Sequence, residues 1–157
     1  MKQHQINIEY QYDEGQLKVG KSIRTAALSA LSILAPVQKI QITVLVCDDE
    51  YMRSLNLTYR GVDKTTDVLS FENQYTLPDS TALYLGDIAI SYPAALRQSI
   101  IAGHDLTAEI SLLTVHGILH LFGYDHQNDN DKNAMWDKQN QILLSLGYEG
   151  MTIIGDE

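Results

Sequence analysis

Residues 116–126, which read H-G-I-L-H-L-F-G-Y-D-H, constrain the fold of this chain more than any other segment. His116 and His120 are four residues apart, so on an α-helix their imidazoles lie on one face, one turn from each other. Gly123 is the expected end of that helix, because a residue without a Cβ readily adopts the left-handed conformation that ends helices. The turn that follows can bring His126 back toward the other two histidines. We therefore expect three imidazoles to converge on one point.

The helix that carries the first two histidines is apolar on almost every side. Residues 107–122 are mostly leucine, isoleucine, valine and alanine, which is the pattern of a buried helix. A buried polar group without a partner costs on the order of 1–3 kcal/mol, and a metal ion shared by the imidazoles removes this cost. Three neutral imidazoles with one open position are typical of catalytic zinc. Nickel or another divalent metal is the alternative ion, and hydrogen-bonded core histidines are the alternative without a metal.

Length and composition favour one globular domain, which we expect to span residues 1–157. Of these residues, 45% are hydrophobic and 20% are charged. The apolar runs are shorter than the ~20 residues of a membrane span, and the first residues lack the apolar core of a signal peptide. The one cysteine, Cys47, fits a reducing compartment. These features predict a cytoplasmic protein without a membrane partner.

The charge balance limits the partners that the chain can bind. A net charge of −9 argues against a broad surface for nucleic-acid phosphates. A metal ion held by three neutral histidines keeps its charge of about +2, so an acidic chain can still contain a local anion site. Lys18, Lys21 and Arg24 share one side of a predicted helix, as either a solvated face or a track for a phosphate backbone.

Hydrophobic periodicity predicts an α+β fold with a mixed four-stranded sheet and about five helices packed around it. The expected strands are residues 6–10, 40–47, 67–71 and 83–91, and the expected helices are residues 19–34, 48 or 49 to 58, 93–102, 107–122 and 130–146. A helix separates the first two strands, which predicts a parallel crossover. No helix separates the last two, so we expect them to be antiparallel. Pro78 and Asp79 indicate a turn between them, and residues 148–157 are expected to be a loosely ordered tail.

The histidine spacing is also that of metzincin zinc peptidases, whose motif is H-E-x-x-H-x-x-G-x-x-H. Those enzymes activate water with the glutamate that follows the first histidine. This chain has Gly117 at that position, so the metal ligands are present and the general base is missing. A metallopeptidase with an unusual base is therefore an alternative function that Gly117 argues against.

Three further blocks of sequence make the chain resemble the YbeY family of bacterial metal-dependent endoribonucleases, also called rRNA maturation factors. They are residues 56–63 (NLTYRGVD) together with 66–71 (TDVLSF), residues 85–88 (LGDI) and residues 116–126. Their order and spacing cover the middle two thirds of the chain. The sequence departs from the family at Glu72, where proline is usual, which affects the geometry of one strand end.

The resemblance implies a hydrolase that uses zinc to cleave single-stranded RNA, in 3′-end maturation of 16S ribosomal RNA and in ribosome quality control. Its partners would be ribosomal RNA and the ribosome or ribosome-associated proteins, with no DNA partner. Matching the motifs residue by residue implies roles for seven residues of this sequence. They are the metal ligands His116, His120 and His126, the catalytic Arg60, and the residues Asn56, Tyr59 and Asp87, which shape the site and bind substrate.

This chemistry also agrees with the residues themselves. Cleavage of a phosphodiester adds negative charge to the nonbridging oxygens, and fixed cations stabilise that charge. A metal ion and the guanidinium of Arg60 would supply two such cations. The nucleophile is either a metal-bound water or the 2′-hydroxyl, and His116 is a candidate acid or base besides being a ligand.

Each of these roles has a structural alternative. Arg60 could instead form a salt bridge with Asp63 or Asp67, and Asp125 either orients a ligand imidazole or stabilises a turn. The whole chain could be a non-catalytic ribosome assembly factor with a structural metal. An open coordination position favours catalysis over that alternative, because structural zinc sites are typically closed by four protein ligands.

Overall fold

The strands of the chain form one mixed sheet, in a computed structural model that describes residues 3–78 and 81–153. The strands are β1 (Gln5–Tyr10), β2 (Ile40–Cys47), β3 (Val68–Thr76) and β4 (Leu83–Ser91), and the helices are α1 (Gln16–Leu34), α2 (Asp49–Arg60), α3 (Tyr92–Ala102), α4 (Leu106–Leu121) and α5 (Asp129–Ser145). The strand order is β1-β2-β4-β3; β1–β2 and β2–β4 are parallel and β3–β4 is antiparallel. The predicted α+β fold, its parallel crossover and its antiparallel pair are confirmed.

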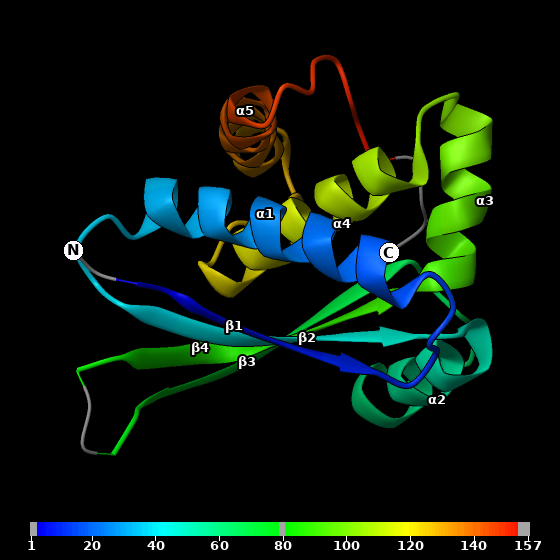
Figure 1. Cartoon of the computed structure of the whole chain (residues 1–157), viewed down its shortest axis with the longest axis horizontal. Coiled ribbons are helices and arrows are strands. Elements are labelled where there is room, and N and C mark those ends of the chain that lie inside the picture. The colour runs from blue at the N-terminus through cyan, green and yellow to red at the C-terminus, as the bar shows by residue number, and fades with distance from the viewer. Residues whose placement is uncertain (1–2, 79–80, 154–157) are drawn as a thin grey trace.

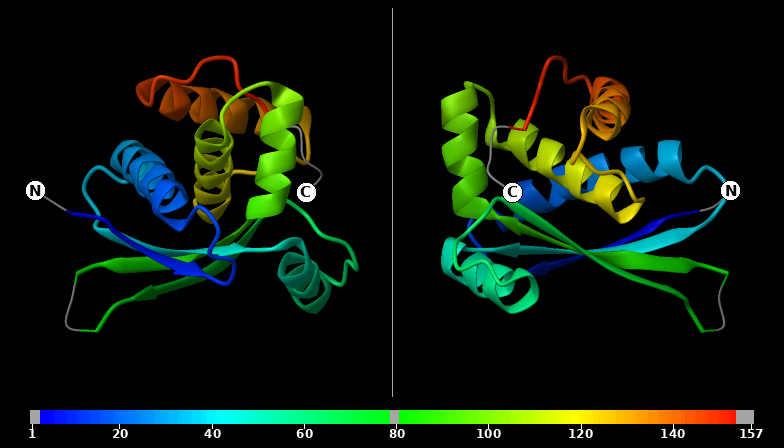
Figure 2. Two further views of the ribbon diagram at one scale, coloured as in Figure 1. Left: turned by 45° about the vertical axis from the view of Figure 1, so that its right-hand side comes forward. Right: turned by 180° about the vertical axis from the view of Figure 1, so that it is seen from behind.

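The helices are distributed unequally over the two faces of the sheet (Figures 1 and 2). Helices α1 and α4 lie over one face and α5 packs on both of them, whereas α2 lies against the opposite face at one end. Alternation along β2 explains the two environments, because Ile42, Val44 and Val46 point into the main core and are fully buried. The opposite face has a smaller apolar cluster under α2 and is otherwise more open.

The central element is α4, which is buried on nearly every side, as its apolar sequence predicts. It crosses the sheet at Gly117. A Cβ at this position would lie 2.9 Å from Cγ2 of Ile88 on β4. The hydroxyl of Ser70 on β3 donates a hydrogen bond to the Gly117 carbonyl at 2.9 Å. Residue 117 therefore has no room for the glutamate of metzincins, because any side chain would push α4 away from the sheet.

The structure corrects the predicted ends of three elements. Helix α1 begins at Gln16, three residues before the predicted start. Helix α2 continues to Arg60 and ends at Gly61, whose φ of 70° is left-handed, so residues 59 and 60 are helical and not part of the loop. Strand β3 continues to Thr76, beyond the predicted end at residue 71. Its second half is an exposed edge with polar side chains, so the apolar pattern ends before the strand does.

The C-terminal segment differs from the predicted loose tail where the structure describes it. Met151 is only 8% exposed and belongs to the main core, and Tyr148 and Ile153 pack against that core. Residues 154–157 lie outside the described residues, as does Asp79 of the predicted turn. None of the helices in the described part of the chain combines the length and the apolar character that crossing a membrane requires.

Replacing Gly117 with alanine tests the close packing of α4 on the sheet. Overpacking against Ile88 is expected to cost about 1–3 kcal/mol, while alanine returns about 1 kcal/mol of helix propensity. The variant should therefore unfold at a lower urea concentration than the wild type. Asn133→Ala, at an exposed position of α5, is the control and should be neutral or slightly stabilising. A Gly117→Ala variant that is more stable than the wild type by the ~1 kcal/mol of helix propensity alone would contradict the packing.

Candidate metal centre

The turn after α4 returns the chain toward the helix, as the sequence predicts. Gly123 has a φ of 93°, which is left-handed, and its N–H donates to the carbonyl of His120 at 3.0 Å. The N–H of Tyr124 donates to the carbonyl of Leu119 at 3.0 Å. The ring of His126 consequently lies 5.6 Å from that of His116 and 5.2 Å from that of His120, between centroids.

The three histidines lie close enough to hold one metal ion. One nitrogen from each of His116, His120 and His126 lies within 4.8 Å of the other two. The Nε2 atoms of His116 and His120 are 3.1 Å apart. In tetrahedral coordination with zinc–nitrogen bonds of about 2.0–2.1 Å, two ligand nitrogens are about 3.3 Å apart. The separation of the two Nε2 atoms therefore fits a shared cation.

Hydrogen bonds to the other ring nitrogens favour the tautomer that ligation needs. Nδ1 of His116 lies 2.9 Å from Oε1 of Gln139, and Nδ1 of His120 lies 2.9 Å from the carbonyl oxygen of Tyr124. With the proton on each Nδ1, both rings donate these hydrogen bonds and each Nε2 can ligate an ion. In that tautomer a shared cation relieves the repulsion between the two Nε2 lone pairs.

Helix α5 supplies two contacts that sequence reasoning missed. Gln139 is fully buried beside His116. The ring of Trp136 lies edge to face with those of His116 and His126, with centroids 5.7 Å away from each. In the sequence, Trp136 and Gln139 are three residues apart and therefore lie on one face of the predicted helix. The sequence could not show that this face packs on the histidines, because residue spacing does not reveal which helices are neighbours.

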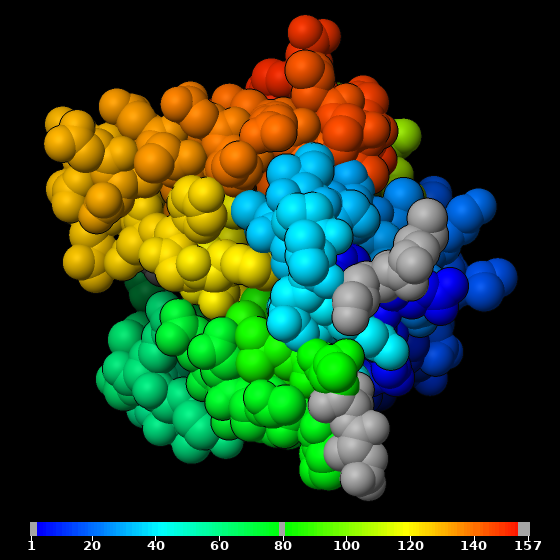
Figure 3. Space-filling view, turned by 90° about the vertical axis from the view of Figure 1, so that its left-hand side faces the viewer, coloured from blue at the N-terminus to red at the C-terminus, as the bar shows by residue number. Residues whose placement is uncertain are grey.

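A cleft of about 540 Å³ opens beside the histidines. It is lined by Arg60, Val68, Ser70, Glu72, His120, Gly123, Tyr124, Asp125, His126 and Gln127. In Figure 3 it lies between the yellow segment that carries the histidines and the teal and green segments of α2 and β3. The last residue of α2, the last turn of α4 and the loop after α4 therefore bring the guanidinium of Arg60 and the imidazoles of His120 and His126 to one concave surface.

Arg60 is exposed at this cleft, whereas the other three arginines bond to protein groups. Arg53 donates two hydrogen bonds to Asp63, at 2.7 and 3.1 Å. Asp63, one of the two partners considered for Arg60, is therefore bonded to Arg53 instead. Arg97 pairs with Asp49 at 2.7 Å, and Arg24 donates to the carbonyl of Ile6 at 3.1 Å.

Asp125, beside the histidines, and Asn56, on α2, have structural roles. Oδ1 of Asp125 accepts a hydrogen bond from the backbone N–H of His126 at 2.8 Å, which is the turn-stabilising role considered from the sequence. Asn56 is buried, and its side-chain amide donates to the carbonyl of Lys64 at 2.9 Å. Asn56 thus closes the loop that directly follows Arg60.

Tyr59 and Asp87 lie apart from the histidine cleft. They line a second cleft, of about 550 Å³, which Phe71 lines as well. The ring of Tyr59 is 66% exposed and packs edge-on against Phe71, with centroids 5.2 Å apart. Asp87 accepts a hydrogen bond from the hydroxyl of Tyr84, and burial raises the pKa of that hydroxyl, so it stays protonated. Glu72 on β3 lines both clefts, so the two are neighbours.

Comparisons with known proteins point to one family. The family model described as endoribonuclease YbeY matches residues 4–147. The chain is 39% identical to the endoribonuclease YbeY of Desulforamulus reducens over 149 residues, which cover 92% of this chain and 93% of that protein. It is 36% identical to the endoribonuclease YbeY of Caldicellulosiruptor bescii over 153 residues, which cover 90% and 97% of the two chains.

A solved structure supports the fold independently. The solution structure of a Thermotoga maritima protein superposes with a TM-score of 0.61 at 23% identity, and covers 88% of this chain and 86% of its own. At this identity the likeness concerns the arrangement of helices and strands alone.

Removing the amide of Gln139 tests the orientation of His116. Gln139→Ala is expected to weaken metal binding about 10- to 100-fold, because the hydrogen bond that keeps Nε2 unprotonated is lost. Competition with a chromogenic zinc chelator measures the affinity. Gln141→Ala, an exposed position on the same helix, is the matched control and should bind metal like the wild type. Equal affinity in both variants would contradict the role of Gln139.

Proposed function

The chain belongs to the endoribonuclease YbeY family, and from this premise we propose that it is a zinc-dependent endoribonuclease for single-stranded ribosomal RNA. The processing step we propose is 3′-end maturation of 16S ribosomal RNA, together with ribosome quality control. The observation that carries the metal chemistry is the meeting of His120, His126 and the exposed Arg60 in one cleft, with His116 directly behind. Nickel or another divalent ion is the alternative to zinc.

The histidines are the residues that would hold the ion. A zinc ion bound by His116, His120 and His126 would polarise a phosphate oxygen and lower the pKa of a bound water. The protein holds the ligand nitrogens in place through Gln139 and the Tyr124 carbonyl. His116 is fully buried, so substrate would approach from the side of His120 and His126. We assign His116 a role as acid or base only in addition to its role as a ligand.

Arg60 is the group we assign to the phosphate. Its guanidinium can donate two parallel hydrogen bonds to phosphate oxygens. Because no carboxylate among the described residues pairs with it, it can do so without first breaking an ion pair. Negative charge grows on those oxygens as the phosphodiester is cleaved, and a donor held at that place stabilises the transition state more than the ground state.

The second cleft extends the substrate path. Tyr59 and Arg60 are consecutive on the last turn of α2 and line different clefts, which meet at Glu72. A strand of RNA with a phosphate at Arg60 could therefore stack a neighbouring base on the exposed ring of Tyr59. Asp87, fixed by Tyr84, shapes the floor of this cleft, and Asn56 holds the loop beside it.

The charge of the chain supports a preference for single strands. With a net charge of −9, the protein cannot bind a duplex through many phosphate contacts along a basic surface. Local contacts at one phosphate and one or two bases suit an unpaired strand, whose bases are free to turn out of the stack. We further propose that residues 1–157 act as one cytoplasmic domain whose partners include ribosome-associated proteins.

The two alternative functions fit the geometry less well. A metallopeptidase needs a base near the ion, and the close contact of Gly117 with Ile88 leaves no room for one at the usual position. A structural zinc would have four protein ligands, whereas the histidine group found among the described residues has three members. The peptidase gives Arg60 no role, whereas an assembly factor whose groove binds RNA would use Arg60 to bind phosphate without cleaving it.

Arg60→Ala is expected to lower the cleavage rate of a single-stranded RNA by about 10²–10³, the usual effect of removing one transition-state donor. Zinc content should stay at the wild-type level, because Arg60 is not a ligand. Arg53→Ala, another exposed arginine of α2, should cleave at the wild-type rate. His120→Ala should lose both the metal and the activity. Equal cleavage by all four proteins would indicate a contaminating nuclease and contradict the proposed function.

Tyr59→Ala tests the second cleft. Stacking of one base on an aromatic ring contributes about 1–3 kcal/mol, so the variant should raise KM roughly tenfold or more with little change in kcat. Tyr59→Phe keeps the ring and should behave like the wild type. If the alanine variant has an unchanged KM for RNAs of at least six nucleotides, Tyr59 does not bind a base.

A further inference from the structure

Helix α2 carries Arg60 but has little apolar anchoring of its own. Only Met52 and Asn56 are buried among its residues. Met52 packs in the small cluster with Cys47, Leu69 and Ala89. Asn56 bonds to the loop that follows the helix and not to the sheet. Leu55 packs against the same cluster, and Tyr59 on the last turn contacts the ring of Phe71. Because so few side chains of α2 are buried, the direction of the helix also depends on what holds its N-terminal end.

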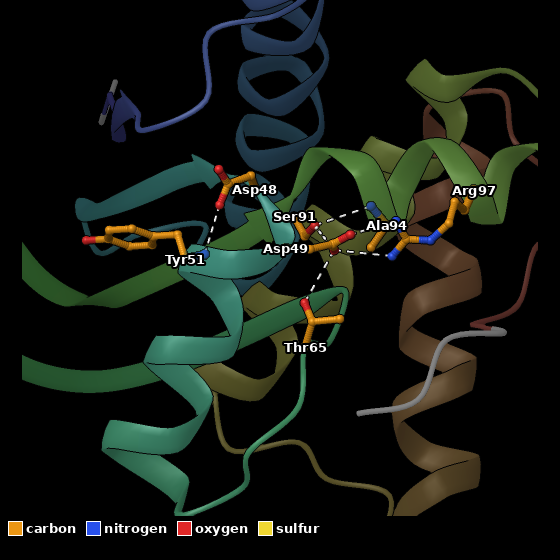
Figure 4. A network of polar contacts seen from close by, with 7 residues as sticks. All are labelled: Asp48, Asp49, Tyr51, Thr65, Ser91, Ala94 and Arg97. Carbon is orange, nitrogen blue, oxygen red and sulfur yellow. Dashed lines mark hydrogen bonds and ion pairs between the residues drawn. The ribbon is translucent and has the colours of Figure 1, made fainter.

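The N-terminal end is held by one carboxylate (Figure 4). Asp49 accepts two hydrogen bonds from Arg97 on α3, at 2.7 and 3.2 Å. It also accepts from the hydroxyl of Ser91, at the end of β4, at 2.9 Å, and from that of Thr65, in the loop before β3, at 3.3 Å. The hydrogen bond from Arg97 lowers the pKa of the Asp49 carboxyl, so the pair is ionic at neutral pH. Four segments of the chain therefore meet at Asp49.

The ion pair between Arg53 and Asp63 provides a contrast on the same helix. Its shortest contact is also 2.7 Å, but Asp63 belongs to the loop directly after α2. This pair joins the helix to its own continuation and leaves its direction relative to α4 unaffected. The Asp49 group ties α2 to both β4 and α3 by hydrogen bonds, in addition to the packing of Met52 with Ala89 of β4.

Asp49 and Arg60 occupy opposite ends of α2, so a small rotation of the helix about Asp49 moves Arg60 by several ångströms. Eleven steps of helical rise separate them by about 16 Å. A rotation of about 10° at Asp49 would displace Arg60 by about 3 Å over that length. A misplacement of about 1 Å at a reacting centre can reduce a rate by about 10². The position of the guanidinium is therefore sensitive to the anchor at Asp49, which acts together with the local contact of Tyr59 with Phe71.

We propose that Asp49 and Arg97 are positioning residues, which set the direction in which α2 delivers Arg60 to the histidine cleft. Their effect on catalysis rests on the proposed function of Arg60, whereas their effect on the direction of α2 does not. Neither residue touches the substrate. Replacing either residue is therefore expected to lower the cleavage rate only when Arg60 is present, and to leave the metal affinity unchanged.

Cleavage kinetics test the catalytic part. Arg97→Ala is expected to lower kcat at least tenfold with zinc affinity unchanged, and Arg97→Lys should recover part of that loss. Arg53→Ala should stay within twofold of the wild type. In an Arg60→Ala background, adding Arg97→Ala should change the rate by less than twofold, because the group that it positions is already gone. A further tenfold loss in that background would show general disruption and overturn the positioning role.

A distance measurement tests the same idea without RNA. Spin labels at Thr58→Cys on α2 and Asn140→Cys on α5 report the direction of the helix by double electron–electron resonance. Cys47 is buried, and burial raises the pKa of its thiol to about 12, so it should not be labelled at neutral pH. Arg97→Ala should shift or broaden the distance distribution, and Arg53→Ala should not.

The two measurements separate the two hypotheses. A changed distribution in a protein that does not cleave RNA would reject the proposed function and retain the anchor of α2. An unchanged distribution in folded Arg97→Ala, with folding checked by its thermal unfolding, would overturn the positioning role even if the wild type cleaves RNA.

Discussion

Two imidazole nitrogens, Nε2 of His116 and Nε2 of His120, lie 3.1 Å apart. The Gln139 amide oxygen and the Tyr124 carbonyl lie 2.9 Å from the opposite nitrogens, so the tautomer in which both rings donate to these oxygens leaves both Nε2 atoms available to one cation. Much of the fold serves this arrangement. The close approach of α4 to the sheet fixes the two rings, the glycine turn returns the third, and α5 covers the group with Trp136.

The electrostatics of the site are local. In an acidic chain, one cation from the metal and one from Arg60 would meet in a cleft of about 540 Å³. Three of the four arginines are bonded to protein groups, and the fourth ends α2 at the cleft. The same acidic surface that discourages nonspecific binding of nucleic acid would leave this cleft as the favourable place for a phosphate. Because Arg60 is the arginine that lines this cleft, its position matters for binding a phosphate, and we propose that the hydrogen bonds of Asp49 help to set that position.

Much of the fold could be predicted from the sequence because its signals are local. The β-branched residues of β2 predicted both ends of that strand correctly, and the predicted ends of β4 are also correct. The apolar pattern of α4, followed by Gly123, predicted the turn between His120 and His126. The end of β3 could not be found in this way, since an exposed edge strand has no apolar face to mark it. Met151 was missed because a short apolar signal after a glycine does not show that a core is nearby.

The contacts between distant elements were also out of reach of sequence reasoning. Neither the bond from Gln139 to His116 nor the pairing of Asp49 with Arg97, 48 residues apart, leaves a periodic signal. The motif match placed Tyr59 and Arg60 together, but only the fold shows that these neighbours line different clefts.

The most direct test of the metal centre is X-ray absorption spectroscopy of the zinc-loaded protein, with the metal content measured on the same sample. Three imidazole nitrogens and at least one oxygen that is not from the protein, at one ion per chain, are the expected result. A fourth protein ligand, or the failure of zinc to bind stoichiometrically, would contradict it.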